Sequence, residues 1–213
     1  MPNSDELLKK IEFKYSYPSA VTAKAKTSVS ELAKGDNRGY DFSAAPAFLS
    51  KSGLTPAERG TATHKFMQFA NYALAAESIE DELLRLKEEH YLTEAEAEAV
   101  EIHKLKKFFT GELFARMSEA ELHREMRFIT ELPVGEDAYD ATVLQGVVDC
   151  VIDEGDSLSV IDFKTDRVAN EEELITRYAD QLSIYADACT KIFSRPIKER
   201  IIYSFHLGKT IIL

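Results

Sequence analysis

Cysteine is scarce in this chain, which has only Cys150 and Cys189 among its 213 residues. The two stand far apart, without the short spacing of metal ligands, so a disulfide framework, a zinc site and an iron–sulfur cluster are all unsupported. Both are expected to be core thiols, because a free cysteine behaves as a small apolar side chain. Metal chemistry based on sulfur ligands is therefore not expected.

Long apolar runs are also missing. No stretch stays apolar over the roughly 20 residues that a membrane-spanning helix needs. The polar opening MPNSDELLKK lacks the apolar segment of a secretory signal peptide. We therefore expect no membrane partner and a cytoplasmic location.

An excess of positive charge is absent too. Lysine and arginine total 26 against 37 acidic residues, which gives a net charge of -11. Between Glu77 and Glu101, ten acids face only Arg85 and Lys87, so this segment carries -8 of the -11 and leaves -3 for the rest. The balance argues against a broad basic surface for nucleic acid and predicts a solvated acidic helical segment.

A phosphate-binding loop is missing despite the string GKT at 208–210. The glycine required five residues before Gly208 is Tyr203, and no helix is expected to follow. We therefore expect no ATP site in this chain.

The composition fits one domain, because 45% of the residues are hydrophobic and the length allows a full core. We expect a single domain over residues 1–213. It divides into a lead segment and loop (1–54), a helical part (55–118), and a sheet core with a hairpin and a long helix (119–213).

Capping signals mark the helices. Thr55, Pro56 and Glu58 form a capping box with proline at the first helical position, and this helix is expected to reach residue 75. His64 lies roughly opposite the apolar stripe, so it faces either solvent or a second polar site. The predicted stripe is Phe66, Phe69, Ala70, Ala73 and Leu74. Other expected elements are a short helix capped by Ser28 or Ser30, a loop at 35–53, helices at 78–91, 93–109, 112–117 and 171–193, a strand at 122–134, and two strands after residue 196.

A β-hairpin at 143–165 is the most informative stretch. Alternating and β-branched apolar residues flank the turn string EGDS at 154–157. With that turn, Asp149 lies opposite Asp162, and the two carboxylates project from one face with Cβ atoms about 5 Å apart. Lys164 shares that face, because strand side chains repeat every second residue.

Two carboxylates facing each other near a core need a compensating cation. Oxygen ligands favour Mg²⁺, Mn²⁺ or Ca²⁺, and Lys164 could then hold or deprotonate an attacking water. The alternative is that Asp149 and Asp162 are unrelated strand-edge acids with Lys164 as a surface salt bridge. Glu125 is most simply one partner of a cross-strand ion pair. It becomes a candidate site residue only if its strand borders the hairpin. Gln181 and Tyr185 share a helix face, either as a surface pair or with Tyr185 in the core.

The sequence resembles the RecB-type branch of the PD-(D/E)XK nuclease superfamily through five motifs in the same order. The resemblance covers the chain from about Tyr15 onward. The motifs are GTATH with His64, EMRF with Glu125, GVVDCVID with Asp149, IDFKTD with Asp162 and Lys164, and QLSIY with Gln181 and Tyr185. Within that branch, KTSVSEL and IIYSFHLG are similar to the carboxy-terminal nuclease domain found in the A subunit of AddAB-type helicase-nucleases. The motif proline before Asp149 is replaced by Val148, a position that varies in this branch.

The resemblance implies a restriction-endonuclease-like α/β fold, with a mixed central sheet, flanking helices and a helical insertion. It implies that His64, Asp149, Asp162 and the carbonyl of Phe163 bind the metal, Mg²⁺ or Mn²⁺. The other implied roles are activation of water by Lys164, assistance at the site by Glu125, and contacts from Gln181 and Tyr185 to the lysine or the DNA.

The implied activity is a metal-dependent deoxyribonuclease, an exonuclease that processes double-strand ends for recombinational repair. A helicase motor would deliver single strands, and a partner helicase-nuclease subunit would cut the other strand. The alternatives are a stand-alone exonuclease of the same superfamily, a degenerate DNA-binding or scaffold domain, and a metal-dependent regulator unrelated to nucleic acid.

Overall fold

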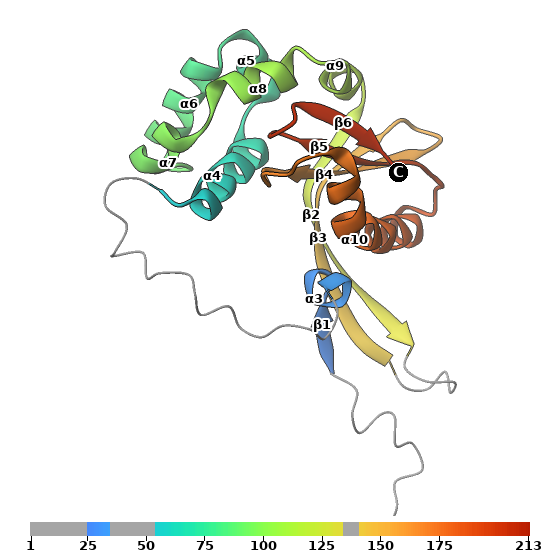
Figure 1. The fold of residues 1–213 in the computed structure, drawn as a ribbon. Coiled ribbons are helices and arrows are strands. Elements are labelled where there is room, and N and C mark those ends of the chain that lie inside the picture. The colour runs from blue at the N-terminus through green and yellow to red at the C-terminus, as the bar shows by residue number, and fades with distance from the viewer. Residues whose placement is uncertain (1–24, 35–53, 134–140) are drawn as a thin grey trace, which may run out of the picture.

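The structure is a computed structural model that describes residues 25–34, 54–133 and 141–213. A mixed six-stranded sheet lies at the centre of this part of the chain (Figure 1). The strands are β1 (Lys26–Ser28), β2 (Glu121–Pro133), β3 (Ala141–Asp153), β4 (Leu158–Lys164), β5 (Ile197–Ser204) and β6 (Lys209–Ile212). The helices are α3 (Val29–Lys34), α4 (Pro56–Phe69), α5 (Tyr72–Glu77), α6 (Ile79–Glu88), α7 (Glu94–Ala99), α8 (Ile102–Phe109), α9 (Glu112–Ser118) and α10 (Glu171–Phe193).

Strand β3 organises the sheet. On one edge it pairs with antiparallel β2 along its whole length. On the other edge, β1 runs parallel to residues 143–145 and β4 runs antiparallel to residues 150–153. Strand β5 lies parallel to β4, and β6 lies antiparallel to β5. Within the described residues, 146–149 of β3 therefore have no strand on this second edge.

Helices cover both faces of the sheet (Figure 1). The group α4 to α9 buries Phe66, Leu86 and Phe108 in a core that includes Cys150 and Ile161 of the sheet. On the other face, α10 buries Leu174 and Leu182 against Val148, Val151 and Val160. This arrangement confirms the predicted mixed sheet flanked by helices, with a helical insertion before β2.

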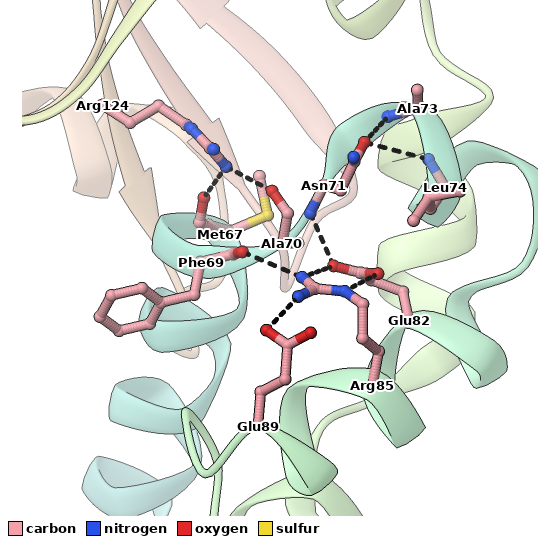
Figure 2. A network of polar contacts seen from close by, with 10 residues as sticks. All are labelled: Met67, Phe69, Ala70, Asn71, Ala73, Leu74, Glu82, Arg85, Glu89 and Arg124. Carbon is pink, nitrogen blue, oxygen red and sulfur yellow. Dashed lines mark hydrogen bonds and ion pairs between the residues drawn. The ribbon is translucent and has the colours of Figure 1, made fainter.

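A polar network determines where α4 ends (Figure 2). Arg124 of β2 donates to the carbonyls of Met67 at 3.1 Å and Ala70 at 2.7 Å. Asn71 starts α5, because its side chain accepts from the N–H groups of Ala73 and Leu74. The Asn71 N–H donates to Glu82 at 2.6 Å, and Arg85 holds that buried carboxylate with two hydrogen bonds. The end of α4 and the start of α5 are thus fixed by side chains.

The prediction of one helix from 56 to 75 is therefore wrong. Ala70 is extended (φ -61°, ψ 141°), and the carbonyls near it bind Arg124 instead of the next helical turn. Part of the predicted apolar stripe moves to the surface as a result: Phe69 is 36% exposed and Leu74 is 45% exposed, whereas Phe66 and Ala70 are buried. The capping box of Thr55 and Glu58 is confirmed.

The predicted helix at 93–109 is also two helices. Val100 is extended and buried between α7 and α8, so the chain turns there to place its side chain in the core. The elements predicted around 78–91, 112–117, 122–134 and 171–193 and after residue 196 are confirmed within a few residues. Ser28 caps α3, since its hydroxyl accepts from the Glu31 N–H at 3.2 Å. The loop predicted at 35–53 lies outside the described residues. Among the described helices, none has the length and apolar character to cross a membrane.

Candidate active site

The hairpin of β3 and β4 has the predicted register. Asp153 lies opposite Leu158 and Cys150 opposite Ile161, and the Glu154 N–H donates to the Ser157 carbonyl at 3.1 Å to close the turn. The same register extended by one pair puts Asp149 opposite Asp162. At this point the strands separate, and the backbone N–H of Phe163 donates to Asp149 Oδ2 at 2.8 Å. The acids therefore lie where the sheet opens.

The buried ring of Phe163 anchors the end of β4. It is 1% exposed and packs edge-on against Phe108, with ring centroids 5.6 Å apart. Because side chains alternate along a strand, Asp162 and Lys164 project from the opposite face, toward α10. Apolar packing on one side thus sets the direction of two polar groups on the other.

Lys164 is held from two sides. Its Nζ lies 2.7 Å from Asp162 Oδ2 and 4.0 Å from the centroid of the Tyr178 ring. The Tyr178 hydroxyl donates to Asp166 Oδ1 at 3.0 Å, which fixes the ring beneath the ammonium group. The lysine side chain, 13% exposed, therefore has little freedom.

Sequence reasoning missed Tyr178. The sequence does hold a signal, because Tyr178 precedes Gln181 by three residues and so lies on the same face of α10. The contact itself depends on the tertiary placement of α10 beside the end of β4. Cation–π contacts of this kind need an ammonium group over the ring face, which no spacing along one helix reveals.

A second cluster meets this pair from three other elements. His64 of α4, Glu125 of β2 and Asp149 of β3 each offer a ligand atom, and these atoms all lie within 4.8 Å of one another. His64 Nδ1 is 3.6 Å from Asp149 Oδ2. Of the two interpretations for His64, solvent or a second polar site, the polar site is confirmed.

Glu125 reaches the cluster through an unusual backbone. Strand β2 borders the hairpin, and the register places Glu125 opposite Asp149, between the pairs Arg124–Cys150 and Met126–Val148. Its φ of +50° is in the left-handed region, which costs a residue with a side chain about 1–2 kcal/mol.

The buried side chains of β2 and β3 switch from one face of the sheet to the other at this pair. On one side of the pair, Met126 and Val148 pack in the core beneath α10. On the other side, Leu122 and Cys150 pack in the core beneath helices α4 to α9. Glu125 and Asp149 thus lie at a pivot of the β2–β3 ribbon. The simple cross-strand ion pair considered for Glu125 does not describe this position.

Burial controls the charges of the site. It raises the pKa of Asp149 and the pKa of Asp162 from 3.8 to about 6 in each case, although the ammonium group of Lys164 opposes the shift. Burial also raises the pKa of Glu125. The pKa of His64 is lowered, first by burial and then by the charge of Lys164, so the imidazole is neutral at pH 7.

These groups fit a hard divalent cation. A neutral imidazole and several carboxylates supply nitrogen and oxygen ligands, and a bound cation would offset the cost of their buried negative charge. Asp162 Oδ2 is buried without an aligned hydrogen bond among the described residues, although Lys164 Nζ is close; the two form an ion pair that leaves ligand capacity on this oxygen.

The tight cluster is not identical to the ligand set that the resemblance implies. Glu125 completes the tight cluster with His64 and Asp149. Asp162 lies next to this cluster and forms an ion pair with Lys164. The backbone of Phe163 lies close to the His64 imidazole and partly opposes the lowering of its pKa by burial and Lys164. The individual roles of these residues stay predictions.

Gln181 and Tyr185 form a buried pair on α10. The Gln181 amide donates to the Tyr185 hydroxyl at 2.8 Å, and the Tyr185 ring packs edge-on against Phe128. The shared face is as predicted, and Tyr185 is a core residue at 5% exposure. No hydrogen bond from either residue to Lys164 occurs in the described structure, so Asp162 and Tyr178 hold the lysine.

A cleft of about 650 Å³ contains the site. It lies along β3 where the second edge has no neighbouring strand. Its lining is Ser28, Val29, His64, Arg127, Phe128, Ile129, Gln145, Gly146, Val147, Asp149, Asp162, Lys164, Gln181 and Tyr185. The predicted site residues therefore lie around one cleft, except Phe163, which faces the core, and Glu125, which joins the cluster at the base of the ribbon.

Comparison with known sequences identifies the family. Residues 28–209 match the PD-(D/E)XK nuclease superfamily. The chain belongs to this superfamily. It is a nuclease domain by family, and divalent metals serve this superfamily in catalysis, in agreement with the chemistry of the ligand cluster.

Individual relatives show which members of the superfamily this chain resembles. The chain is 33% identical over 233 aligned positions to the A subunit of the ATP-dependent helicase/nuclease of Bacillus cytotoxicus and to that of Bacillus thuringiensis. Each alignment covers 94% of this chain and 19% of the relative, so the chain spans about a fifth of the length of these proteins. The resemblance to the RecB-like nuclease domain of such a helicase-nuclease is thereby confirmed.

Proposed function

We propose that this chain is a divalent-metal-dependent deoxyribonuclease that hydrolyses phosphodiester bonds in single-stranded DNA. The observation that supports this most is the convergence of His64, Glu125 and Asp149 beside the ion pair of Asp162 and Lys164. Nucleases of this superfamily need a metal and a positioned basic group at one phosphate. His64, Asp149, Asp162 and Lys164 line one cleft, and Glu125 joins His64 and Asp149 at its edge.

His64, Asp149, Glu125 and Asp162 would hold Mg²⁺ or Mn²⁺, with the Phe163 carbonyl as the further ligand that the resemblance implies. When bound, the metal polarises the phosphoryl oxygen and lowers the pKa of a water molecule. His64 is suited to this task because its pKa is lowered, which keeps a ring nitrogen free to coordinate.

Lys164 positions the attacking water and balances the negative charge that grows on the phosphate. The water oxygen attacks phosphorus in line with the 3′-oxygen, and the P–O3′ bond breaks. The water loses its proton and the leaving 3′-oxygen gains one, which gives a 3′-hydroxyl and a 5′-phosphate. Asp162 and the Tyr178 ring keep the ammonium group at the phosphate.

Two further features favour a single strand as substrate. Besides Lys164, the described lining of the cleft includes the cation Arg127 and an apolar side chain, Ile129, which is 75% exposed. An unpaired base has an apolar face that can lie against such a side chain, whereas a duplex needs a broader basic surface than a chain of net charge -11 offers.

The names of the relatives suggest the wider context. We propose that the domain acts within a longer helicase-nuclease, whose motor delivers single strands and whose partner subunit cuts the opposite strand. The chain would then act as an exonuclease on the strand that ends 3′ at a double-strand break, during recombinational repair. A degenerate scaffold domain is disfavoured, because no acid or lysine of the expected set is missing.

Degradation of end-labelled single-stranded DNA by the purified chain tests the activity. We expect cleavage in Mg²⁺ or Mn²⁺, none in EDTA, and a loss on the order of 10²–10³ in rate for Lys164→Met. Lys191→Met is the matched control, since Lys191 is exposed near the far end of α10. Cleavage that persists in EDTA, or equal activity of the two variants, would contradict the proposal. A wild-type chain that degrades no DNA in either metal would contradict it for the isolated domain.

A further inference from the structure

A second cavity, of about 340 Å³, lies next to the active-site cleft. Its floor includes two buried apolar residues, Leu105 of α8 and Phe205 after β5. Its rim carries three cations: Arg59 of α4, Lys104 of α8 and Arg167, which follows β4. A cationic rim above a low-dielectric floor strengthens the local field and favours an anion.

The acids of this cavity are already engaged. Asp166 accepts the hydrogen bond from Tyr178 and lies 3.9 Å from Arg177, and Glu101 is paired with Lys104. Glu101 also attracts Arg167, so this one carboxylate faces two of the three cations and the rim keeps an excess of positive charge.

The two arginines of the rim are in a different position. Within the part of the chain that the structure describes, neither Arg59 nor Arg167 has an acidic oxygen within ion-pair distance: Arg59 donates to the Leu54 carbonyl at 3.1 Å, and Glu101 attracts Arg167 at longer range. Two exposed arginines without a close acidic partner line the same cavity, and this favours an external anion there. A guanidinium group matches a phosphate with two parallel hydrogen bonds.

Two residues that line the cavity are sequence neighbours of residues that line the active-site cleft. Thr63 lines the cavity and the next residue, His64, faces the cleft; Thr165 lines the cavity and the preceding Lys164 faces the cleft. The wall between the two is thin because α4 touches the end of β4: a Cβ on Gly60 would lie only 2.7 Å from Thr165 Oγ1. Because Lys164 and Thr165 are adjacent residues, a strand whose phosphate reaches Lys164 has a neighbouring phosphate close to the cavity.

We propose that this cavity binds a backbone phosphate of the substrate strand, next to the phosphate that is cleaved, through Arg59 and Arg167. The inference rests on the proposed function and adds a subsite to it. Arg127 lines the cleft and the arginine pair lines the neighbouring cavity, so a strand that occupies both contacts cations in each. This explains how a chain with a strongly negative net charge holds DNA at its metal site.

Binding of a fluorescein-labelled single-stranded oligonucleotide in EDTA, measured by anisotropy at several salt concentrations, tests the subsite without cleavage. We expect Arg59→Gln/Arg167→Gln to weaken binding about tenfold and to lower the salt slope by about one to two. The double variant Lys87→Gln/Lys191→Gln removes the same charge from surface sites elsewhere and should change binding by less than about twofold. Arg59→Lys/Arg167→Lys should retain part of the affinity, because lysine keeps the positive charge but cannot form the two parallel hydrogen bonds of a guanidinium group.

Two results would overturn the inference and leave the proposed function standing. Equal loss of affinity in the glutamine pair and in the control pair would show a general charge effect and no subsite. Wild-type affinity in Arg59→Gln/Arg167→Gln would show that the strand does not pass the cavity, while the proposed function stands. If the wild-type chain neither binds nor cleaves the strand, the proposed function fails together with the subsite, so the two failures are distinguishable.

Discussion

The carboxyl groups of Asp149 and Asp162 make the stability of the metal-free protein depend on pH. Their pKa values rise to about 6 on folding, so the folded chain binds protons more readily than the unfolded chain between about pH 4 and 6. The stability they contribute is therefore fully present below about pH 4 and is lost as the pH rises through 6. In EDTA at neutral pH, Asp162→Asn should raise the free energy of unfolding by roughly 1–3 kcal/mol, measured by urea denaturation.

Asp153 provides a control of opposite sign. Its hydrogen bonds with Arg195 lower its pKa to about 2, so its contribution is present above the unfolded pKa and is lost as the pH falls through 2. Asp153→Asn should therefore destabilise the protein at neutral pH. If Asp162→Asn also destabilised it, the buried carboxylate would be a structural partner of Lys164, and the interpretation of Asp162 as a site for cation binding would be contradicted.

The Tyr178 ring should matter for catalysis more than its hydroxyl does. Tyr178→Phe keeps the ring beneath Lys164, whereas Tyr178→Leu removes a cation–π contact and should lower kcat about three- to thirtyfold with less change in KM. NMR offers a readout that is independent of activity: the ε-methylene protons of Lys164 should be shifted upfield by the ring in the wild type and in Tyr178→Phe, but not in Tyr178→Leu. Equal kcat for the two variants would contradict a positioning role.

At the scale of elements, the β2–β3 ribbon stores strain at Glu125. Its φ of +50° suits glycine better than any residue with a Cβ. Glu125→Gly and Glu125→Ala both lose the carboxylate, yet the glycine variant should be the more stable by about 1 kcal/mol in thermal or urea unfolding. A regular strand position would give the reverse order, because glycine is normally unfavourable in a strand.

The sequence predicted those elements whose signals are local. The turn at 154–157 and the alternation around it were sufficient for the register that opposes Asp149 and Asp162, and Thr55 marked the start of α4. The end of α4 could not be predicted, because it depends on Arg124, which is far away in the chain and takes the carbonyl of Ala70. Local propensity cannot report such a partner.

At the scale of the whole molecule, the site exists because the sheet opens. Strands β1 and β4 share one edge of β3 and leave residues 146–149 between them, so α4 from one layer and α10 from the other both reach the gap. The motifs predicted which side chains belong to the site. They did not predict that Glu125 replaces Asp162 in the tight cluster or that Tyr178 supports the lysine, because both follow from how strands and layers meet in space.

Binding of Mn²⁺ to the isolated chain, followed by electron paramagnetic resonance, is the measurement that decides whether His64 of α4 and the acids of the central strands form a divalent-metal site. The method needs neither DNA nor a motor, so it reports on the site alone. We predict that the wild type and the control Asp153→Asn bind Mn²⁺. Asp149→Asn should weaken binding at least about tenfold, because it removes the charged carboxylate that lies close to both His64 and Glu125. Equal Mn²⁺ affinity in the wild type and Asp149→Asn would contradict the account.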